Sequence, residues 1–182
     1  MTPHLREMIE EVRAALAADL QNTLSFAQFN GGAAPDTIPD GLPADLRELL
    51  LVADGLRAGS IDLAAIEDLA GVQYFLDYVP RHAPVADDPD VWLVVGTKSD
   101  EPLFMERQTG SVWHFPPTGT EWFMGDRFEP FAQDPTSFLL RFVFGSGYRA
   151  LVGNDDRWYE FLGQQGLPHR SDPNVDNYAP NL

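Results

Sequence analysis

The stretch VWLVVGTKSDEPLFMERQTGSVWHF, residues 91–115, decides the fold. It begins with the uninterrupted apolar run 91–95, which suits a strand that is covered on both faces. We expect Gly96 to end this strand. Residues 97–102 are polar apart from one proline, and this composition predicts a loop.

A hairpin is predicted in the second half of this stretch. Residues 103–107 and 111–115 have the length and apolar content of two short strands. The short connection 108–110 fits a hairpin in which Gly110 takes a positive φ. With the preceding strand, these elements predict a three-stranded antiparallel meander at the centre of the domain.

The composition indicates an acidic globular protein. The 182 residues suit a single domain, residues 1–182, and 44% of them are hydrophobic. The formal net charge is −16, so phosphate backbones and anionic membrane surfaces would repel the chain. We therefore expect neither nucleic acid nor membrane as a partner. A basic protein would be attracted, although the acidity could equally serve solubility alone.

The sequence lacks residues and segments that several chemistries and cellular locations require. Cysteine is absent, which rules out disulfides, thiol nucleophiles and cysteine-bound metal. The N-terminal residues do not form the apolar core of a signal peptide. No apolar run approaches the roughly 20 residues that a membrane helix needs. We expect a cytoplasmic protein.

Amphipathic helices are predicted before the meander. Thr2 is a suitable N-cap with Pro3 at the first helical position. Apolar residues then recur at helical spacing: Leu5, Met8, Ile9, Val12, Leu16 and Leu20. A second helix is expected from Pro43, with Gly55 as its left-handed C-cap.

Between the second helix and residue 125 the patterns are less regular. Residues 61–63 are predicted to form a short strand, and 64–69 one or two helical turns. The aromatic and β-branched run 72–79 favours a strand, although a helix fits it as well. Residues 81–90 predict a polar loop, and 121–124 a further strand.

The C-terminal part predicts two more helices. Asp134 is a suitable N-cap with Pro135 behind it, and the Gly-Ser-Gly run 145–147 should end this helix. Asn154 is expected to cap a short final helix. From Gly166 onward, the polar, proline-bearing tail is expected to be partly irregular.

Two motifs resemble known nucleotide or metal sites but lack their essential partners. Lys98 and Asp100 match the guanine-recognition loop of small GTPases, yet no phosphate-binding GxxxxGK[ST] loop precedes them. An EF-hand loop that starts at Asp87 would place Pro89 at its third position and Lys98 at its twelfth, where carboxylates are required. Solvated loops explain both motifs better.

Histidines and tryptophans give no catalytic signature. The histidines are scattered without metal-binding spacing: His4, His82, His114 and His169. His114 alternates with Trp113 and Phe115, so it should point to the opposite face of its strand. The tryptophans could line a ligand groove or fill the core: Trp92, Trp113, Trp122 and Trp158. We expect no catalytic residue, no cofactor and no metal.

Three features in order resemble the SUKH superfamily, which includes a fungal regulator of cell-wall synthesis and many bacterial toxin-immunity proteins. The first is a proline-initiated helix that ends in Asp-Gly, with matching positions Pro43, Leu49, Leu50, Asp54 and Gly55. The second is the strand and turn 61–69. The third is the meander, with matching positions Gly96, Asp100, Phe104, Thr109, Gly110 and Val112. A late helix, 135–144, occupies the place where the family closes its domain.

The resemblance implies an α+β fold, a twisted and largely antiparallel sheet with helices packed around it. It covers about residues 40–145 and leaves an added N-terminal helix, a C-terminal helix and a tail unexplained. It also implies a binding module and not an enzyme, because bacterial members neutralise a cognate polymorphic toxin by direct contact.

The sequence and the resemblance together predict a bacterial immunity protein whose partner is a basic toxin domain. We expect its contact surface on acidic loops, at Asp87, Asp88, Asp90, Asp100 and Glu101. A regulatory or scaffold module of the same fold, with a partner that is not a toxin, is the alternative. A hydrolase or ligand-binding protein that uses an aromatic groove is a third, from a different class.

Overall fold

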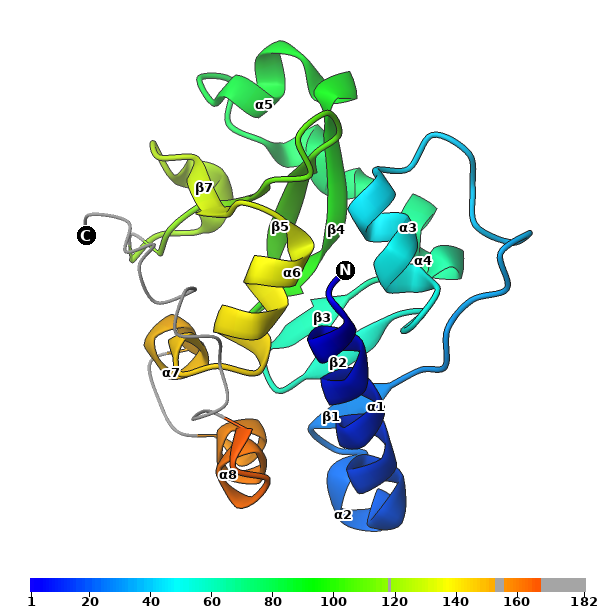
Figure 1. Cartoon of the computed structure of the whole chain (residues 1–182). Coiled ribbons are helices and arrows are strands. Elements are labelled where there is room, and N and C mark those ends of the chain that lie inside the picture. Colours follow the sequence, from blue (N-terminus) through cyan, green and yellow to red (C-terminus); the bar gives the residue numbers. More distant parts are fainter. Residues whose placement is uncertain (118, 153–155, 168–182) are drawn as a thin grey trace.

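A seven-stranded antiparallel sheet runs through the molecule, and its strands follow one another in the order of the sequence (Figure 1). The computed structural model of the chain describes residues 1–117, 119–152 and 156–167. The strands are β1 Ala27–Phe29, β2 Leu56–Ala58, β3 Ile61–Leu63, β4 Trp92–Lys98, β5 Glu101–Glu106, β6 Val112–His114 and β7 Glu129–Ala132. Together with the helices around it, this sheet confirms the predicted α+β class.

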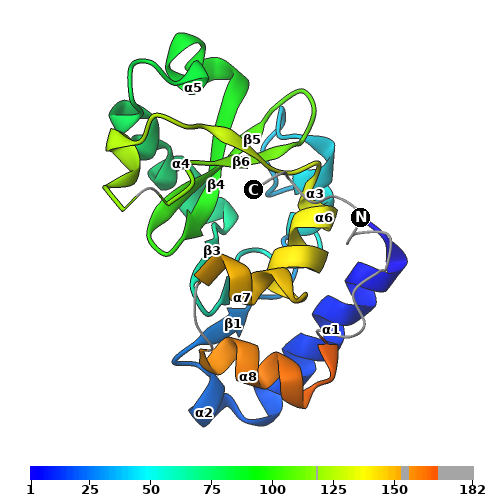
Figure 2. The same cartoon turned by 90° about the vertical axis from the view of Figure 1, so that its left-hand side faces the viewer.

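Helices lie on both faces of the sheet. The α-helices are α1 Pro3–Ala18, α2 Leu20–Thr23, α3 Ala44–Leu50, α4 Ile66–Val72, α5 Pro84–Asp87, α6 Pro135–Phe138, α7 Gly147–Val152 and α8 Arg157–Gln164. Tighter 3₁₀ turns form η1 Gln73–Tyr78, η2 Pro89–Val91 and η3 Trp122–Met124, and a π-helix forms η4 Leu139–Val143. In Figure 2, α1, α3 and α6 lie on one side of the strands, and α4 lies on the other.

Alternation along the central strands divides the apolar residues between two cores. One face of β4 and β5 sends Leu93 and Met105 into the larger core beneath α1, α3 and α6. The opposite face sends Val94 and Phe104 into a smaller aromatic core beneath η1 and η3. The predicted strand covered on both faces is therefore confirmed for residues 92–95, whereas Val91 belongs to η2.

The predicted meander is confirmed as β4, β5 and β6, and Gly110 has a φ of 76°. The loop expected at 97–102 is wrong. β4 continues past an irregularity in register at Gly96 as far as Lys98, and β5 already begins at Glu101. A two-residue turn joins them, with φ of 48° at Ser99 and 66° at Asp100. Positive φ at both central residues matches the twist of a tight hairpin, so no longer loop is needed.

Several weaker assignments between the second helix and β7 need correction. The run 72–79 is helical, as η1, and 121–124 contains η3 and not a strand. The polar stretch 81–90 contains the short helices α5 and η2. Gly55 has the expected positive φ of 82°, but α3 ends before it, and the glycine instead leads directly into β2. The strand 61–63 and the turns that follow it are confirmed as β3 and α4.

The terminal helices follow their predicted caps with one change. Thr2 caps α1 and Asp134 caps α6, as predicted. Leu20, predicted to continue the apolar face of the first helix, instead lies in α2 and is 56% exposed. Asp156 caps α8, since its side chain accepts a hydrogen bond from the amide of Tyr159. The expected cap Asn154 and the tail 168–182 lie outside the described residues.

Candidate functional site

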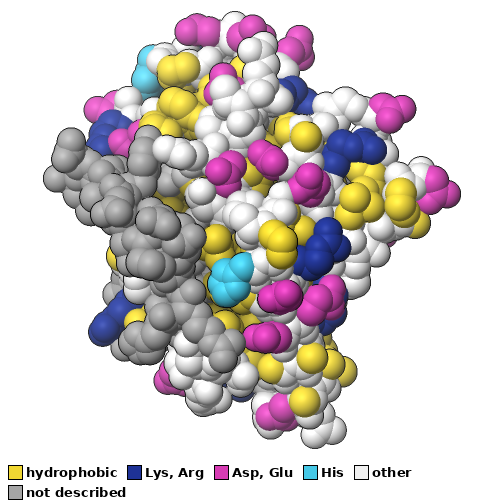
Figure 3. Space-filling model, in the orientation of Figure 1, with side chains coloured by type: hydrophobic (Ala, Val, Ile, Leu, Met, Phe, Trp, Pro, Cys, Tyr) yellow, Lys and Arg dark blue, Asp and Glu magenta, His cyan; other side chains and the backbone are white. Residues whose placement is uncertain are grey.

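The five predicted partner-binding residues occupy two separate places. Asp87, Asp88 and Asp90 are exposed on α5 and η2, immediately before β4, and carboxylates gather over α5 in Figure 3. Asp100 lies in the two-residue turn after β4, and Glu101 begins β5. A strand of this length spans about 20 Å, so the two acidic groups lie at opposite ends of β4 and do not form one patch.

Glu101 is largely neutralised within the chain. Its Oε2 lies 2.8 Å from Nζ of Lys98, whose side chain is only 4% exposed. A buried ammonium requires such a partner, because an unpaired charge would be costly to remove from water. Glu101 therefore serves the stability of the β4–β5 hairpin, whereas Asp100 in the turn remains exposed.

The structure brings Asp100 close to a carboxylate that sequence reasoning did not single out, Asp62 on β3. The pKa of Asp62 is raised, chiefly by partial burial of its carboxyl group and further by the negative charge of Asp100, while Arg57 opposes the change. Like charges that raise a pKa in this way mark a region of concentrated negative potential.

Asp62 belongs to a row of polar residues on the part of the sheet that α4 leaves open. Gln28, Arg57, Asp62 and Thr97 are direct neighbours across β1, β2, β3 and β4. Their sequence neighbours on β1 and β2 alternate into the larger core, for example Ala58. This row therefore presents polar side chains to solvent beside α4.

A shallow hollow of about 460 Å³ lies between this row and α4. Three carboxylates line it, Asp62 from β3 and Glu67 and Asp68 from the first turn of α4, and we call it the acidic hollow. The positive end of a helix favours carboxylates in its first turn. A second hollow of about 180 Å³ shares Asp62 and Asp68 and extends over Arg57.

The cations nearest to the acidic hollow are engaged elsewhere. Arg57 donates from its guanidinium to the carbonyl of Leu24, and Lys98 pairs with Glu101. Among the described residues, no ion pair reaches Asp62, Glu67 or Asp68. The three carboxylates thus have no ion-pair partner in the described part of the chain, and Arg57 offsets the charge of Asp62 only in part.

A sequence signal for these three residues existed but is common. Asp62 lies between two apolar residues of a short strand, which predicts an outward direction, and Glu67 and Asp68 follow at the start of a helix. Nothing local predicts that they line the same hollow, because their proximity depends on how α4 packs beside β4.

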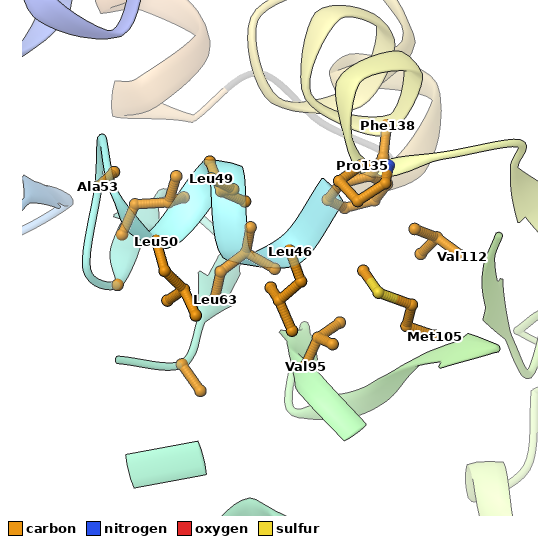
Figure 4. Close-up of a pocket in the computed structure, with 13 residues that line it drawn as sticks. Leu46, Leu49, Leu50, Ala53, Leu63, Val95, Met105, Val112, Pro135 and Phe138 are labelled. Atoms are coloured by element: carbon orange, nitrogen blue, oxygen red, sulfur yellow. The ribbon is translucent and has the colours of Figure 1, made fainter. Parts of the chain in front are cut away.

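The apolar cavity in the larger core is too small for a ligand. Its volume is about 20 Å³, and Figure 4 shows Leu46, Val95 and Met105 converging on it from α3, β4 and β5. Small-molecule sites usually enclose about 300–1,000 Å³. This cavity is therefore a packing defect of the core.

The tryptophans pack in the two cores. Of the two interpretations that the sequence allows, a ligand groove or core packing, the structure supports core packing. Trp158 is fully buried in the larger core, and Trp92 is buried in the aromatic one, where its ring meets Trp113 at 5.4 Å. Trp122 is partly buried and packs on Phe115 at 5.6 Å. None of the hollows and cavities described above is lined by a tryptophan.

The described histidines do not form a site. His114 is buried and stacks on Phe131 at 4.2 Å, on the opposite face of β6 from Trp113, as predicted. Burial, with the positive charges of Lys98 and Arg127, lowers its pKa to about 3, so the ring is neutral at physiological pH. In the described ranges, no group of three or more histidine, aspartate and glutamate side chains is placed to hold a metal ion. His169 lies outside these ranges.

No helix among the described residues is both long and apolar enough to span a membrane.

Comparison of the chain with models of known protein families, and with curated proteins, finds no match. The resemblance to SUKH proteins accordingly stays a prediction.

Proposed function

We propose that the chain is a non-enzymatic binding protein that docks a basic protein on the acidic hollow. One observation carries the proposal: Asp62, Glu67 and Asp68 line an open hollow with Asp100 nearby and without an ion pair from the described residues. A lysine or arginine side chain of a partner would find complementary charge there. Such complementarity accelerates encounter and disfavours acidic competitors.

The resemblance to SUKH proteins supports a narrower form of this proposal. On that resemblance, the partner is a cognate bacterial toxin domain, which the chain neutralises by covering its basic, functional surface. The net charge of −16 agrees with a target that binds nucleic acid, since such a target carries a basic groove. The alternative is a regulatory or scaffold module whose partner is also basic but not toxic.

Co-expression with the product of the neighbouring gene tests the narrower proposal. The gene beside that of this chain is expressed in a bacterial host with and without the chain, and growth is followed. An immunity protein restores growth and binds the purified product directly. If the product is not toxic but binds, the regulatory alternative is supported; if it does neither, the toxin proposal is contradicted.

The location of the contact is tested with two matched charge reversals. Asp68→Lys introduces a cation into the acidic hollow and should weaken binding at least about tenfold. Glu7→Lys makes the same change in net charge on the exposed face of α1, on the other side of the sheet. Equal loss of affinity in both variants would mean that only net charge matters and that the hollow is not the site.

A further inference from the structure

Aromatic and apolar side chains are exposed on two neighbouring 3₁₀ turns, η1 and η3. Tyr74 and Tyr78 of η1 are 53% and 61% exposed, and Phe123 and Met124 of η3 are 44% and 67% exposed. We call these four residues the aromatic patch. Single exposed apolar residues are ordinary, but a group of them on adjacent elements marks an interaction surface.

The patch is held rigidly by ring contacts that continue into the aromatic core. Tyr74 stacks on Phe75 at 4.3 Å, and Phe75 meets Trp122 at 5.8 Å. Trp122 in turn meets Phe123 at 5.7 Å. Figure 2 shows the yellow-green turn of η3 beside η1, in agreement with these contacts. A surface fixed in this way loses little conformational entropy when it binds.

The aromatic patch lies next to the acidic hollow. α4 ends at Val72 and η1 begins at the next residue, so the helix that supplies Glu67 and Asp68 continues into the turn that supplies Tyr74. Gly71, near the end of α4, lines the hollow, and a Cβ built on it would meet no atom within 4 Å. The surface between hollow and patch is therefore open.

Carboxylates also surround the patch itself. Asp77 lies between the two tyrosines on η1, and Glu121 and Asp126 flank η3, all three exposed. Arg81 and Arg127 are the cations of these two segments, and Arg127 is paired with Glu129. An occupant with positive charge around an apolar centre complements this arrangement, whereas a second copy of this acidic chain would be repelled.

We propose that the aromatic patch and the acidic hollow form one continuous interface for an amphipathic basic segment of the partner protein. The hollow takes its lysine or arginine side chains, and the patch takes its apolar side chains. This inference rests on the proposed function and adds the apolar half of the contact. Tyrosine and phenylalanine supply large, rigid contact area, and methionine adapts to the shape of the partner.

Two synthetic peptides separate the apolar contact from the charge. One is an amphipathic lysine–leucine peptide, and the other is an oligolysine of the same charge. Calorimetric titration should give an affinity for the amphipathic peptide that is at least about tenfold higher. The double variant Tyr74→Ser/Phe123→Ser should remove this preference and leave oligolysine binding unchanged. Leu51→Ser, at an apolar residue that is 40% exposed directly after α3 on the other side of the sheet, is the matched control.

A steric variant tests the continuity of the interface. Gly71→Trp places a large side chain between hollow and patch and should weaken binding of the amphipathic peptide about tenfold or more. Gly163→Trp is its control, because Gly163 is also helical, on α8, and a Cβ there also meets nothing within 4 Å. Circular dichroism and thermal unfolding confirm that each variant is folded.

The outcomes distinguish this inference from the proposed function. If both peptides bind equally and the patch variants change nothing, the patch proposal is overturned while a basic partner remains supported. If neither peptide binds, the proposed function fails as well. If sedimentation shows a dimer of this chain that the patch variants dissociate, the occupant is a second copy, and the proposal is overturned.

Discussion

The phenolic hydroxyl of Tyr148 donates a hydrogen bond to Oδ2 of Asp156 over 2.5 Å and thereby joins α7 to the N-cap of α8. The same hydroxyl accepts a hydrogen bond from the amide of Ser60, at 2.9 Å, in the turn between β2 and β3. Because Tyr148 is fully buried, one side chain fixes the C-terminal helices to the β2–β3 turn.

Tyr148→Phe should destabilise the protein by about 1–3 kcal/mol, because it leaves the Ser60 amide without its acceptor and Oδ2 of Asp156 without its donor. Urea unfolding followed by circular dichroism measures the change. Tyr159→Phe is the control, since it removes a hydroxyl from a partly buried tyrosine of α8 and should cost less than about 0.5 kcal/mol. Equal effects of the two variants would refute the bridging role.

The same hydroxyl should make the protein sensitive to alkali. Burial, followed by the hydrogen bond to Asp156, raises the pKa of Tyr148 well above its usual value near 10. In the unfolded chain the group ionises at about pH 10, whereas in the folded protein it stays neutral, so unfolding is favoured as pH rises above about 10. Tyr148→Phe should flatten this part of the stability profile. An unchanged alkaline slope in the variant would contradict the assignment.

His114 should dominate a loss of stability in mild acid. Its folded pKa is lowered to about 3, while an unfolded histidine titrates near 6.5. The unfolded state therefore takes up a proton first, and stability falls as pH decreases below about 6.5. At pH 4.5 the loss is about 2–3 kcal/mol.

Comparison of the acid-induced loss of stability in wild type and in His114→Phe separates the contribution of His114 from that of the carboxylates. Phenylalanine retains the stack on Phe131 but cannot be protonated. Urea unfolding at pH 7 and pH 4.5 should therefore show a smaller loss for the variant. If both proteins lose the same stability, His114 is accessible to protons in the folded state.

The sequence predicts most of the fold because its strands and caps are encoded locally. The apolar run 91–95, the Gly110 turn and the caps Thr2 and Asp134 all depend on a few adjacent residues, and the structure bears them out. At Ser99 and Asp100 the sequence predicts a longer loop than the structure has, because neither residue is the glycine that usually signals positive φ.

Asp100→Gly should stabilise the hairpin by about 0.5–1 kcal/mol, since glycine adopts the φ of 66° without the steric cost that Asp100 bears. The loss of a negative charge beside Asp62 should also lower the pKa of that carboxyl group. Thermal unfolding and NMR titration measure the two effects. Asp100→Asn, which removes the charge but keeps a branched side chain, should change the Asp62 pKa and leave stability nearly unaltered. A destabilised glycine variant would contradict the turn assignment.

The candidate site is predicted far less completely than the fold. The acidic run makes Asp87, Asp88 and Asp90 conspicuous in the sequence. In the structure, these residues lie at the opposite end of β4 from Asp100. Asp62 is a single acidic residue and Glu67–Asp68 is an ordinary acidic pair, and the register of β3 with β4 and the packing of α4 bring them together. Such long-range packing leaves no local pattern.

Two triple variants with the same change in charge decide between these acidic surfaces. Asp87→Asn/Asp88→Asn/Asp90→Asn neutralises the group predicted from sequence, and Asp62→Asn/Glu67→Gln/Asp68→Asn neutralises the acidic hollow. Long-range steering depends on net charge, so both variants should slow association with oligolysine to a similar, modest extent. Only the variant that loses direct contacts should dissociate faster, because local contacts act mainly on the dissociation rate.

We expect the hollow variant to raise the dissociation constant about tenfold or more and the other variant about threefold or less, as measured by surface plasmon resonance at two salt concentrations. Glu67 and Asp68 also lie at the positive end of α4, so neutralising them should cost about 0.3–1 kcal/mol each, and folding of this variant is checked at the measuring temperature. If the variant at 87–90 dissociates faster and the hollow variant does not, the partner contacts α5 and η2, and the hollow is only a solvated feature of the sheet.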